Sequence, residues 1–356
     1  MTSALFRADG SDRLGMGHIM RCLAFALELR QRNIDSTFVI RNYNDEIAKV
    51  ILGYGFNVEQ INKESPVTEA IEFTRGIASK IGSRIIVADL CTRPAMEDRQ
   101  ELDEHHRELG TGYFLLSLSG GQIVDLPGDI IVSPYVITSD QGNTLNEQVQ
   151  LLGPDYFIFR PEFINASSKS RDIVPIAHRV LVCVGGSDEL FLTSKIVKAL
   201  CAINGLELTI RVVIGPVYTE SLKRQVIELL ENFNGDHELL AHDSDLAMAM
   251  LSSDLVIIGD GLIKYEAAVT GTPSIMLSRF DSESAPNMIF EQAGTTRHLG
   301  DGGQIPVQIL AEEIRKILVD AELRRSMSQN GKALVDGKGL TRIIERIPQD
   351  VLEIES

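Results

Sequence analysis

The polar residues near the start of the chain have the types and spacing of a site that moves a proton. Arg7 lies near the end of an apolar stretch, Asp9 and Ser11 follow it, and His18 and Arg21 open an amphipathic stretch. A neutral imidazole accepts a proton near pH 7, and charged side chains beside it bind polar or anionic ligands. The group therefore predicts a ligand-binding site in which His18 can act as a base.

Two predicted elements position His18. The apolar run at 3–8 predicts a strand, and apolar residues at 19, 20, 23 and 27 have helical spacing. His18 then lies at the helix N-terminus, where the macrodipole disfavours a charged imidazolium. Gly15 and Gly17 let the turn bend sharply and bring backbone N–H groups close to an anionic or sugar ligand. A plain strand-to-helix turn with a capping histidine is the alternative.

A second glycine turn occurs in the other half of the chain, in VCVGGSDELF at 182–191. A predicted strand ends there and a predicted helix follows. The backbone N–H groups around Gly185, Gly186 and Ser187 can then meet a phosphate. Ser187 and Asp188 are equally suited to be simple N-caps of that helix.

Short apolar runs alternate with helical patterns along the whole chain of 356 residues, including a predicted strand at 156–159. This rhythm is typical of parallel sheets wrapped by helices, and the length favours two domains. We expect an α/β protein with Rossmann-like domains at 1–164 and 178–338, joined by a polar linker at 165–177. A last helical pattern at 339–356 could cross back to the first domain. Ligands of such sheets bind outside the carboxyl ends of the strands, so we expect the site in a cleft between the domains.

The composition excludes several classes of function. Lys and Arg total 34 against 50 Asp and Glu, which gives a formal charge of −16 and argues against nucleic acid as a partner. The four cysteines form no CxxC pair, and no histidine or carboxylate cluster has metal-ligand spacing. We expect no metal, no cofactor, no membrane insertion and a cytoplasmic location. The oligomeric state stays open, with a monomer favoured. His105 and His106 lie in an acidic helical stretch and are expected on its solvent-exposed face.

The opening pattern also carries a resemblance. Residues 7–23 read R-x-D-x-S-x-x-x-G-x-G-H-x-x-R-C-L, and DYFIFRPEF at 155–163 and VLVCVGGSD at 180–188 follow in order. This pattern resembles the UDP-sugar hydrolases of pseudaminic acid biosynthesis, which release UDP from a diacetamido-trideoxy sugar and are relatives of the two-domain GT-B glycosyltransferases. The resemblance implies a GT-B-like fold and His18 as the general base for water. Asp9 would orient His18 or bind substrate.

The resemblance also implies which residues contact the ligand. The expected substrate-binding residues are Arg7, Ser11, Gly15, Gly17, Arg21 and Asp89. The expected nucleotide-binding residues are Gly185, Gly186, Ser187, Gly259, Asp260, Gly261, Glu266 and Asn287. Among these, Glu266 would accept hydrogen bonds from the ribose hydroxyls, although a plain solvated helix position is the alternative.

This chain departs from the family pattern at four places. Asp260 stands where relatives have Ser or Thr, and Asn287 is the nearest equivalent of an Asn-Gln pair. The tyrosine expected two positions after Asp89 is absent, and SLSGGQ at 117–122 replaces an Asp-Asp pair. A UDP-sugar hydrolase is our leading prediction. A GT-B glycosyltransferase and a non-catalytic nucleotide-sugar binding protein are the alternatives.

Overall fold

The computed structural model describes residues 3–9, 17–41, 45–62, 64–90, 99–119, 126–135, 144–145, 148–241, 245–279 and 285–352. The chain divides into two compact units. Unit 1 comprises Met1–Arg160 and Lys338–Ser356, and unit 2 comprises Pro161–Gly337. The C-terminal segment therefore belongs to the same unit as the N-terminus.

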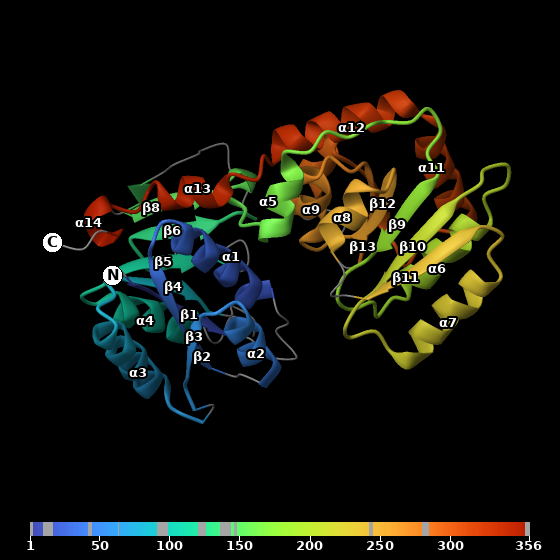
Figure 1. Ribbon diagram of the computed structural model, residues 1–356. Coiled ribbons are helices and arrows are strands. Elements are labelled where there is room, and N and C mark those ends of the chain that lie inside the picture. Colours follow the sequence, from blue (N-terminus) through green and yellow to red (C-terminus); the bar gives the residue numbers. More distant parts are fainter. Residues whose placement is uncertain are drawn as a thin grey trace. The chain divides into compact units, whose positions relative to one another are not determined.

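Unit 1 is built on a sheet with the strand order β3-β2-β1-β4-β5-β6-β8-β7 (Figure 1). Its strands are β1 (Ser3–Asp9), β2 (Asp35–Arg41), β3 (Asn57–Gln60), β4 (Ile85–Asp89), β5 (Phe114–Leu118), β6 (Ile130–Ser133), β7 (Thr144–Leu145) and β8 (Gln148–Leu152). All neighbouring strands are parallel except β7 and β8. The chain builds outward from β1 in one direction and then restarts at β4 on its other side, so the topological switch point lies between β1 and β4.

Helices cover both faces of this sheet. They are α1 (Gly17–Gln31), α2 (Asp45–Gly53), α3 (Val67–Lys80), α4 (Arg99–Gly110), α13 (Gly339–Ile344) and α14 (Gln349–Leu352). Apolar residues of α1, α2, α13 and α14 pack with Phe6 of β1 in one core. Residues of α3 and α4 pack with Leu5 in the core on the opposite face. Successive strand residues point to opposite faces, so β1 supplies both cores.

Unit 2 contains a wholly parallel sheet with the order β11-β10-β9-β12-β13-β14. Its strands are β9 (Arg179–Cys183), β10 (Thr209–Ile214), β11 (Asp236–Ala241), β12 (Leu255–Gly259), β13 (Ser274–Ser278) and β14 (Thr296–Asp301). Its helices are α5 (Pro161–Ser167), α6 (Leu192–Cys201), α7 (Glu220–Glu231), α8 (Leu246–Leu251), α9 (Ile263–Val269), α10 (Ala285–Gln292), α11 (Val307–Val319) and α12 (Ala321–Leu334). The switch point lies between β9 and β12, from which the two glycine turns emerge.

The stretch expected as a linker is packed on unit 2. It begins within α5, which contacts α8 and α9. Arg171 donates hydrogen bonds to the carbonyl of Met250 and the hydroxyl of Thr272, and buried Arg324 donates to the carbonyls of Val174 and Pro175. The polar composition of 165–177 therefore serves hydrogen bonding to unit 2, and the division between the units lies between Arg160 and Pro161, before the stretch expected as a linker.

No strand forms at 156–159, where the sequence predicts one. The last strand of the unit 1 sheet in chain order is instead β8. A 3-10 turn, η2 (Pro154–Tyr156), leads instead into an extended segment. Gly339 packs against this backbone so closely that a Cβ there would lie 2.4 Å from the carbonyl oxygen of Phe157. The apolar side chains are thus buried by the return of the C-terminal segment, which Figure 1 shows in red as α13 and α14.

Within the described residues, no helix is both long and apolar enough to cross a membrane.

Candidate functional site

A buried carboxylate organises the site residues of unit 1. Asp89, the last residue of β4, is fully buried, and its Oδ1 lies 2.6 Å from Nδ1 of His18. Arg21 donates from Nη2 to Oδ1 at 2.5 Å and from Nε to Oδ2, and the Cys22 thiol donates to Oδ2 at 3.6 Å. We call His18, Arg21, Cys22 and Asp89 the His18 cluster. Its members come from α1 and β4, on the two sides of the switch point.

The helix start explains this arrangement. Helix α1 begins at Gly17, so His18 occupies its first turn, as the sequence predicts. His18 and Arg21 are three residues apart and therefore lie on the same helix face. That face lies over the carboxyl end of β4, which runs parallel to β1 and pairs Ala8 with Asp89.

The charges of the His18 cluster keep Asp89 ionised. Burial alone would raise its pKa, but the positive charge of Arg21, the interaction with His18 and their hydrogen bonds outweigh burial and hold the pKa well below its usual range. Burial alone would lower the pKa of Arg21, but the attraction of Asp89, Tyr135 and Cys22 together with the hydrogen bond to Asp89 outweighs burial and raises it. A buried cation and a bidentate carboxylate thus form a fixed pair.

The pair selects one tautomer of His18. An ionised carboxylate only accepts hydrogen bonds, so the proton of the neutral ring lies on Nδ1 and is donated to Asp89. Nε2 then carries the lone pair that can accept a proton. The His18 side chain is 18% exposed, whereas Asp89 is not exposed at all. Asp89 is therefore placed to orient His18, and the substrate-binding role expected for it stays a prediction.

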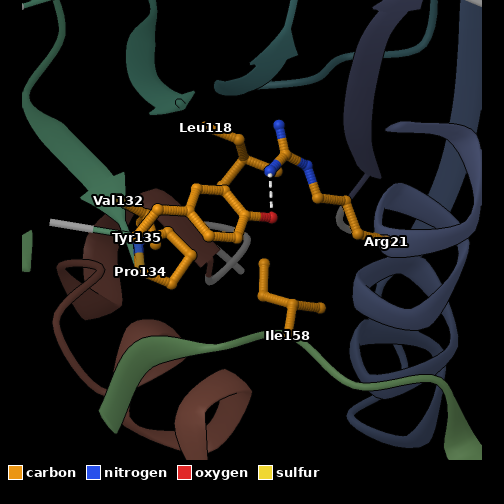
Figure 2. A pocket seen from close by; sticks show the side chains of 6 residues that line it. All are labelled: Arg21, Leu118, Val132, Pro134, Tyr135 and Ile158. Carbon is orange, nitrogen blue, oxygen red and sulfur yellow. Dashed lines mark hydrogen bonds between the residues drawn. The ribbon is translucent and has the colours of Figure 1, made fainter. Parts of the chain in front are cut away.

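A small hollow adjoins the His18 cluster. It is lined by Arg21, Leu118, Val132, Pro134, Tyr135 and Ile158. Figure 2 shows the Tyr135 hydroxyl turned toward Arg21, whose Nη1 donates to it at 3.3 Å and to the carbonyl of Ser119 at 3.0 Å. Burial raises the pKa of Tyr135. Tyr135 thus reaches the cluster from just after β6, although the tyrosine expected two positions after Asp89 is absent.

The other expected residues of this region have different places. Arg7 is fully buried, and its strand neighbour Ala88 belongs to the core beneath α3 and α4. Because strand residues alternate between faces, Arg7 lies on the face opposite Asp89 and is not part of the His18 cluster. The backbone of Asp9 ends β1, but Asp89 takes the orienting role proposed for Asp9. Gly17 starts α1 with open space where a Cβ would stand. Ser11, Gly15 and the side chain of Asp9 lie outside the described residues.

His105 and His106 correct another expectation. Both side chains are buried on α4, where we expected a solvent-exposed face. Burial, followed by the charge of Arg7, lowers the pKa of His105 to about 3. The acidic sequence of α4 is typical of an exposed helix, but α4 packs on α3 and on the sheet through its few uncharged residues.

The pKa of His105 predicts acid sensitivity. The unfolded chain binds a proton at this histidine below about pH 6.5, whereas the folded chain resists protonation down to about pH 3. Stability should therefore fall as the pH decreases between these values, by about 2–3 kcal/mol from pH 6.5 to pH 4. Urea unfolding of His105→Asn should show a shallower pH dependence. The same change at the exposed His237 is the control, and equal slopes for all three proteins would contradict the assignment.

In unit 2, two glycine turns leave the sheet at its switch point. Gly185 adopts a φ of +141°, which favours glycine, and Gly186 is exposed. Asp188 is buried and accepts the N–H groups of Leu192 and Thr193 at 2.8 Å each. The capping role left open for Ser187 and Asp188 thus belongs to Asp188. Anion binding by the backbone before it stays a prediction.

The second turn has a more specific structure than the sequence predicts. Gly259 is buried, and a Cβ there would lie 2.3 Å from the carbonyl oxygen of Val184, so the close approach of the chains after β9 and β12 requires glycine. Asp260 accepts from Nε of Arg279 at 3.0 Å and from its backbone N–H at 3.2 Å. The guanidinium also lies beside Gly261, 3.6 Å from where its Cβ would be.

Arg279 and Lys264 are therefore functional candidates that sequence reasoning missed. Buried Lys264 donates to the backbone carbonyl of Asp260 and to Oδ1 of Asn287, each at 2.8 Å. Burial lowers the pKa of Lys264 to about 8. The signal for Arg279 was its position directly after β13, at the same sheet edge as both glycine turns.

Asn287 and Glu266 differ in how they fit the expected nucleotide site. Asn287 is buried, and its amide donates to the hydroxyl of Ser278 at 3.3 Å while its oxygen accepts from Lys264. Asn287 is thus engaged within the fold, and the direct nucleotide contact expected for it stays a prediction. Glu266 lies on α9, partly exposed, in the first turn after the Gly259–Gly261 segment.

Within the described ranges, no group of three or more histidine, cysteine, aspartate or glutamate side chains could hold a metal ion. Metal independence stays a prediction.

Comparison with known proteins adds the family relationship. No protein-family model matches the chain. The chain is 28% identical, over 98% of each sequence, to the spore coat polysaccharide biosynthesis protein SpsG of Bacillus subtilis. Among solved structures, MurG of Acinetobacter baumannii superposes with a TM-score of 0.66 and 13% identity, covering 97% of this chain and 99% of that one. A UDP-GlcNAc 2-epimerase of Neisseria meningitidis bound to UDP-GlcNAc gives 0.64 and 12%, covering 97% and 98%. These matches span both units: the chain is similar to SpsG over nearly its whole length, and it has the GT-B fold.

Proposed function

We propose that the chain transfers a sugar from a uridine diphosphate donor to a hydroxyl acceptor, with His18 as the general base. The observation that carries the proposal is the hydrogen bond of 2.6 Å between Nδ1 of His18 and the buried carboxylate of Asp89, from which we infer that Nε2 is the proton acceptor. In this step Nε2 takes the proton of the acceptor hydroxyl as its oxygen attacks the anomeric carbon. The bond from that carbon to the phosphate oxygen breaks, and UDP leaves with the electron pair.

Unit 2 would bind the nucleotide. The turns at 185–187 and 259–261 offer backbone N–H groups at a sheet switch point, where ligands of α/β folds bind. Arg279 lies beside both turns and supplies positive charge for a diphosphate. The epimerase named above was solved with UDP-GlcNAc, and the name of the curated relative refers to polysaccharide biosynthesis. Both support a nucleotide sugar as the ligand class.

Hydrolysis is the second candidate, with water in place of the acceptor hydroxyl. The observation that favours it is the pattern from Arg7 to Leu23, which resembles the UDP-sugar hydrolases of pseudaminic acid biosynthesis. The same His18 lone pair would then activate water. The substrate would be a UDP-linked amino-deoxysugar of a nonulosonic acid or surface-polysaccharide pathway.

One assay separates these functions. Purified protein is incubated with UDP-linked N-acetylated amino sugars, with and without a crude polysaccharide acceptor, and UDP, free sugar and glycosylated product are quantified. UDP release that requires acceptor and yields a glycosylated product supports the transferase. Release of equal amounts of UDP and reducing sugar without acceptor supports the hydrolase. UDP-sugar binding with no release under either condition would indicate a non-catalytic binding protein and refute both.

Glu266 gives a test of the nucleotide site alone. If its carboxylate accepts hydrogen bonds from both ribose hydroxyls, Glu266→Ala should weaken UDP binding by about 1.5–3 kcal/mol, or roughly 10- to 100-fold. Calorimetry with UDP measures this directly. Glu228→Ala on the distant helix α7 is the control. An unchanged affinity for Glu266→Ala would remove the ribose role.

A further inference from the structure

Arg279 bridges the two glycine turns of unit 2. It follows β13, and its guanidinium lies beside positions on both turns. A Cβ on Gly185 would be 3.8 Å from Nη1 of Arg279, and a Cβ on Gly261 would be 3.6 Å from Nη2. The absence of side chains at both glycines leaves room for the guanidinium against the backbone. The cation is therefore part of the anion-binding geometry of both turns.

Asp260 holds this cation from within the second turn. Its two oxygens accept the Nε–H and the backbone N–H of Arg279, so the carboxylate fixes both the side chain and the start of the loop after β13. The side chains of Arg279 and Asp260 are only 18% and 11% exposed. Charges this shielded from water interact more strongly than a surface pair.

The carboxylate of Asp260 lies where it would repel a phosphate bound at the turn. Asp260 is flanked by Gly259 and Gly261, whose turn we assign to the diphosphate. An anion that accepts hydrogen bonds from Arg279 must approach an existing anion to within a few ångströms, which is unfavourable in a partly buried site.

We propose that Asp260 is a built-in competitor of the nucleotide diphosphate for Arg279, and so sets the affinity and the release of UDP. The inference rests on the proposed nucleotide site in unit 2. In the ligand-free protein Asp260 neutralises Arg279 and keeps it in place. When the diphosphate binds, its oxygens share or replace the carboxylate of Asp260 as acceptors of the Arg279 hydrogen bonds. As UDP leaves, Asp260 accepts these hydrogen bonds again. A turn residue that opposes binding thereby favours product release.

The decisive variant is Asp260→Asn. The amide is nearly isosteric and keeps an oxygen that can accept one hydrogen bond from Arg279, while the negative charge disappears. We expect UDP to bind the full-length variant about tenfold more tightly than it binds the wild type. Arg279→Gln should weaken binding, and Asp260→Asn should give a clearly smaller gain when Arg279→Gln is already present, because only the direct repulsion by Asp260 is then relieved. The gain should be larger for UDP than for UMP, because UDP carries more charge.

A second ion pair in unit 2 offers a matched control. Asp254 accepts a hydrogen bond from Nη2 of Arg179 at 2.6 Å. Asp254 directly precedes β12 and Arg179 is the first residue of β9, so this pair lies at the edge of the sheet opposite the glycine turns. Asp254→Asn should change the unfolding temperature but leave UDP affinity unchanged. The comparison separates loss of any buried aspartate from loss of the charge beside the turns.

Calorimetric titration of all variants with UDP distinguishes the outcomes, with thermal unfolding as the check that each is folded. Tighter binding by Asp260→Asn that depends on Arg279 supports the inference. Wild-type binding of UDP combined with equal or weaker binding by folded Asp260→Asn overturns the inference and leaves the nucleotide site standing. No UDP binding by either protein overturns the nucleotide site and the inference with it.

Discussion

Turnover of the wild-type protein should fall by roughly 10²- to 10⁴-fold in His18→Asn, which is the usual worth of a general base. The variant should fold and bind UDP normally, because His18 belongs to unit 1 whereas the nucleotide turns that we propose belong to unit 2. Asparagine is also a good residue for the start of a helix, so α1 should be preserved. Initial rates of UDP release, measured beside calorimetric UDP affinity, test whether catalysis and binding separate.

Two controls sharpen the His18 experiment. His237→Asn exchanges an exposed histidine of unit 2 and should leave the rate unchanged. If His18 is the base, the wild-type rate should also decline at acidic pH, and this decline should be missing from the residual activity of His18→Asn. A near-normal rate for the variant with an accepted substrate would leave His18 as a structural residue of the first helical turn.

The elements that position His18 follow directly from local sequence. The apolar run at 3–8 and the helical spacing after His18 predict β1 and the start of α1, because both signals depend on neighbouring residues. The Rossmann-like alternation likewise indicates two parallel sheets. The sequence pattern does not contain the order of strands within a sheet.

That missing information explains why the role of Asp89 was not predicted. Asp89 lies 71 residues from His18 in the chain and meets it only because β4 pairs with β1 across the switch point. Asp9, much closer in sequence, was the obvious partner. A strand-terminal aspartate after a buried run such as IIVAD was the available signal, but its neighbour could not be named without the topology.

Burial of polar residues was the other source of error. Arg7 looked like a ligand-binding residue, and His105 and His106 looked like surface residues, yet all three are buried. They share the region between β1 and α4, and the charge of Arg7 contributes to the lowered pKa of His105. Local hydrophobicity could not reveal the burial of the two histidines, because their neighbours Asp103, Glu104, Arg107 and Glu108 are charged.

Asp89→Asn should destabilise unit 1 and also reduce turnover. The change leaves the guanidinium of Arg21, whose side chain is 10% exposed, without its counter-charge. Breaking a buried pair on one side costs about 3–5 kcal/mol. An amide also no longer enforces the Nδ1–H tautomer of His18, so we expect a loss of turnover of about 10²- to 10⁴-fold in the fraction that remains folded. Urea unfolding and rate measurements test the two effects separately.

The pair can be tested further by removing both charges and by lowering the pH. Arg21→Gln combined with Asp89→Asn leaves no buried charge unpaired, so the double variant should be more stable than Asp89→Asn alone by at least about 1 kcal/mol. It should stay inactive, because neither residue then holds His18.

The folded pKa of Asp89 lies below its unfolded value, so the carboxylate contributes stability above about pH 4 and loses this contribution as the pH falls further. Asp254→Asn is the control for the stability loss caused by Asp89→Asn. Its partner Arg179 is 49% exposed, so the guanidinium left without a counter-charge should destabilise the fold less. Equal costs for Asp89→Asn and Asp254→Asn, or a double variant less stable than Asp89→Asn, would show that Asp89 is not the counter-charge on which the His18 cluster depends.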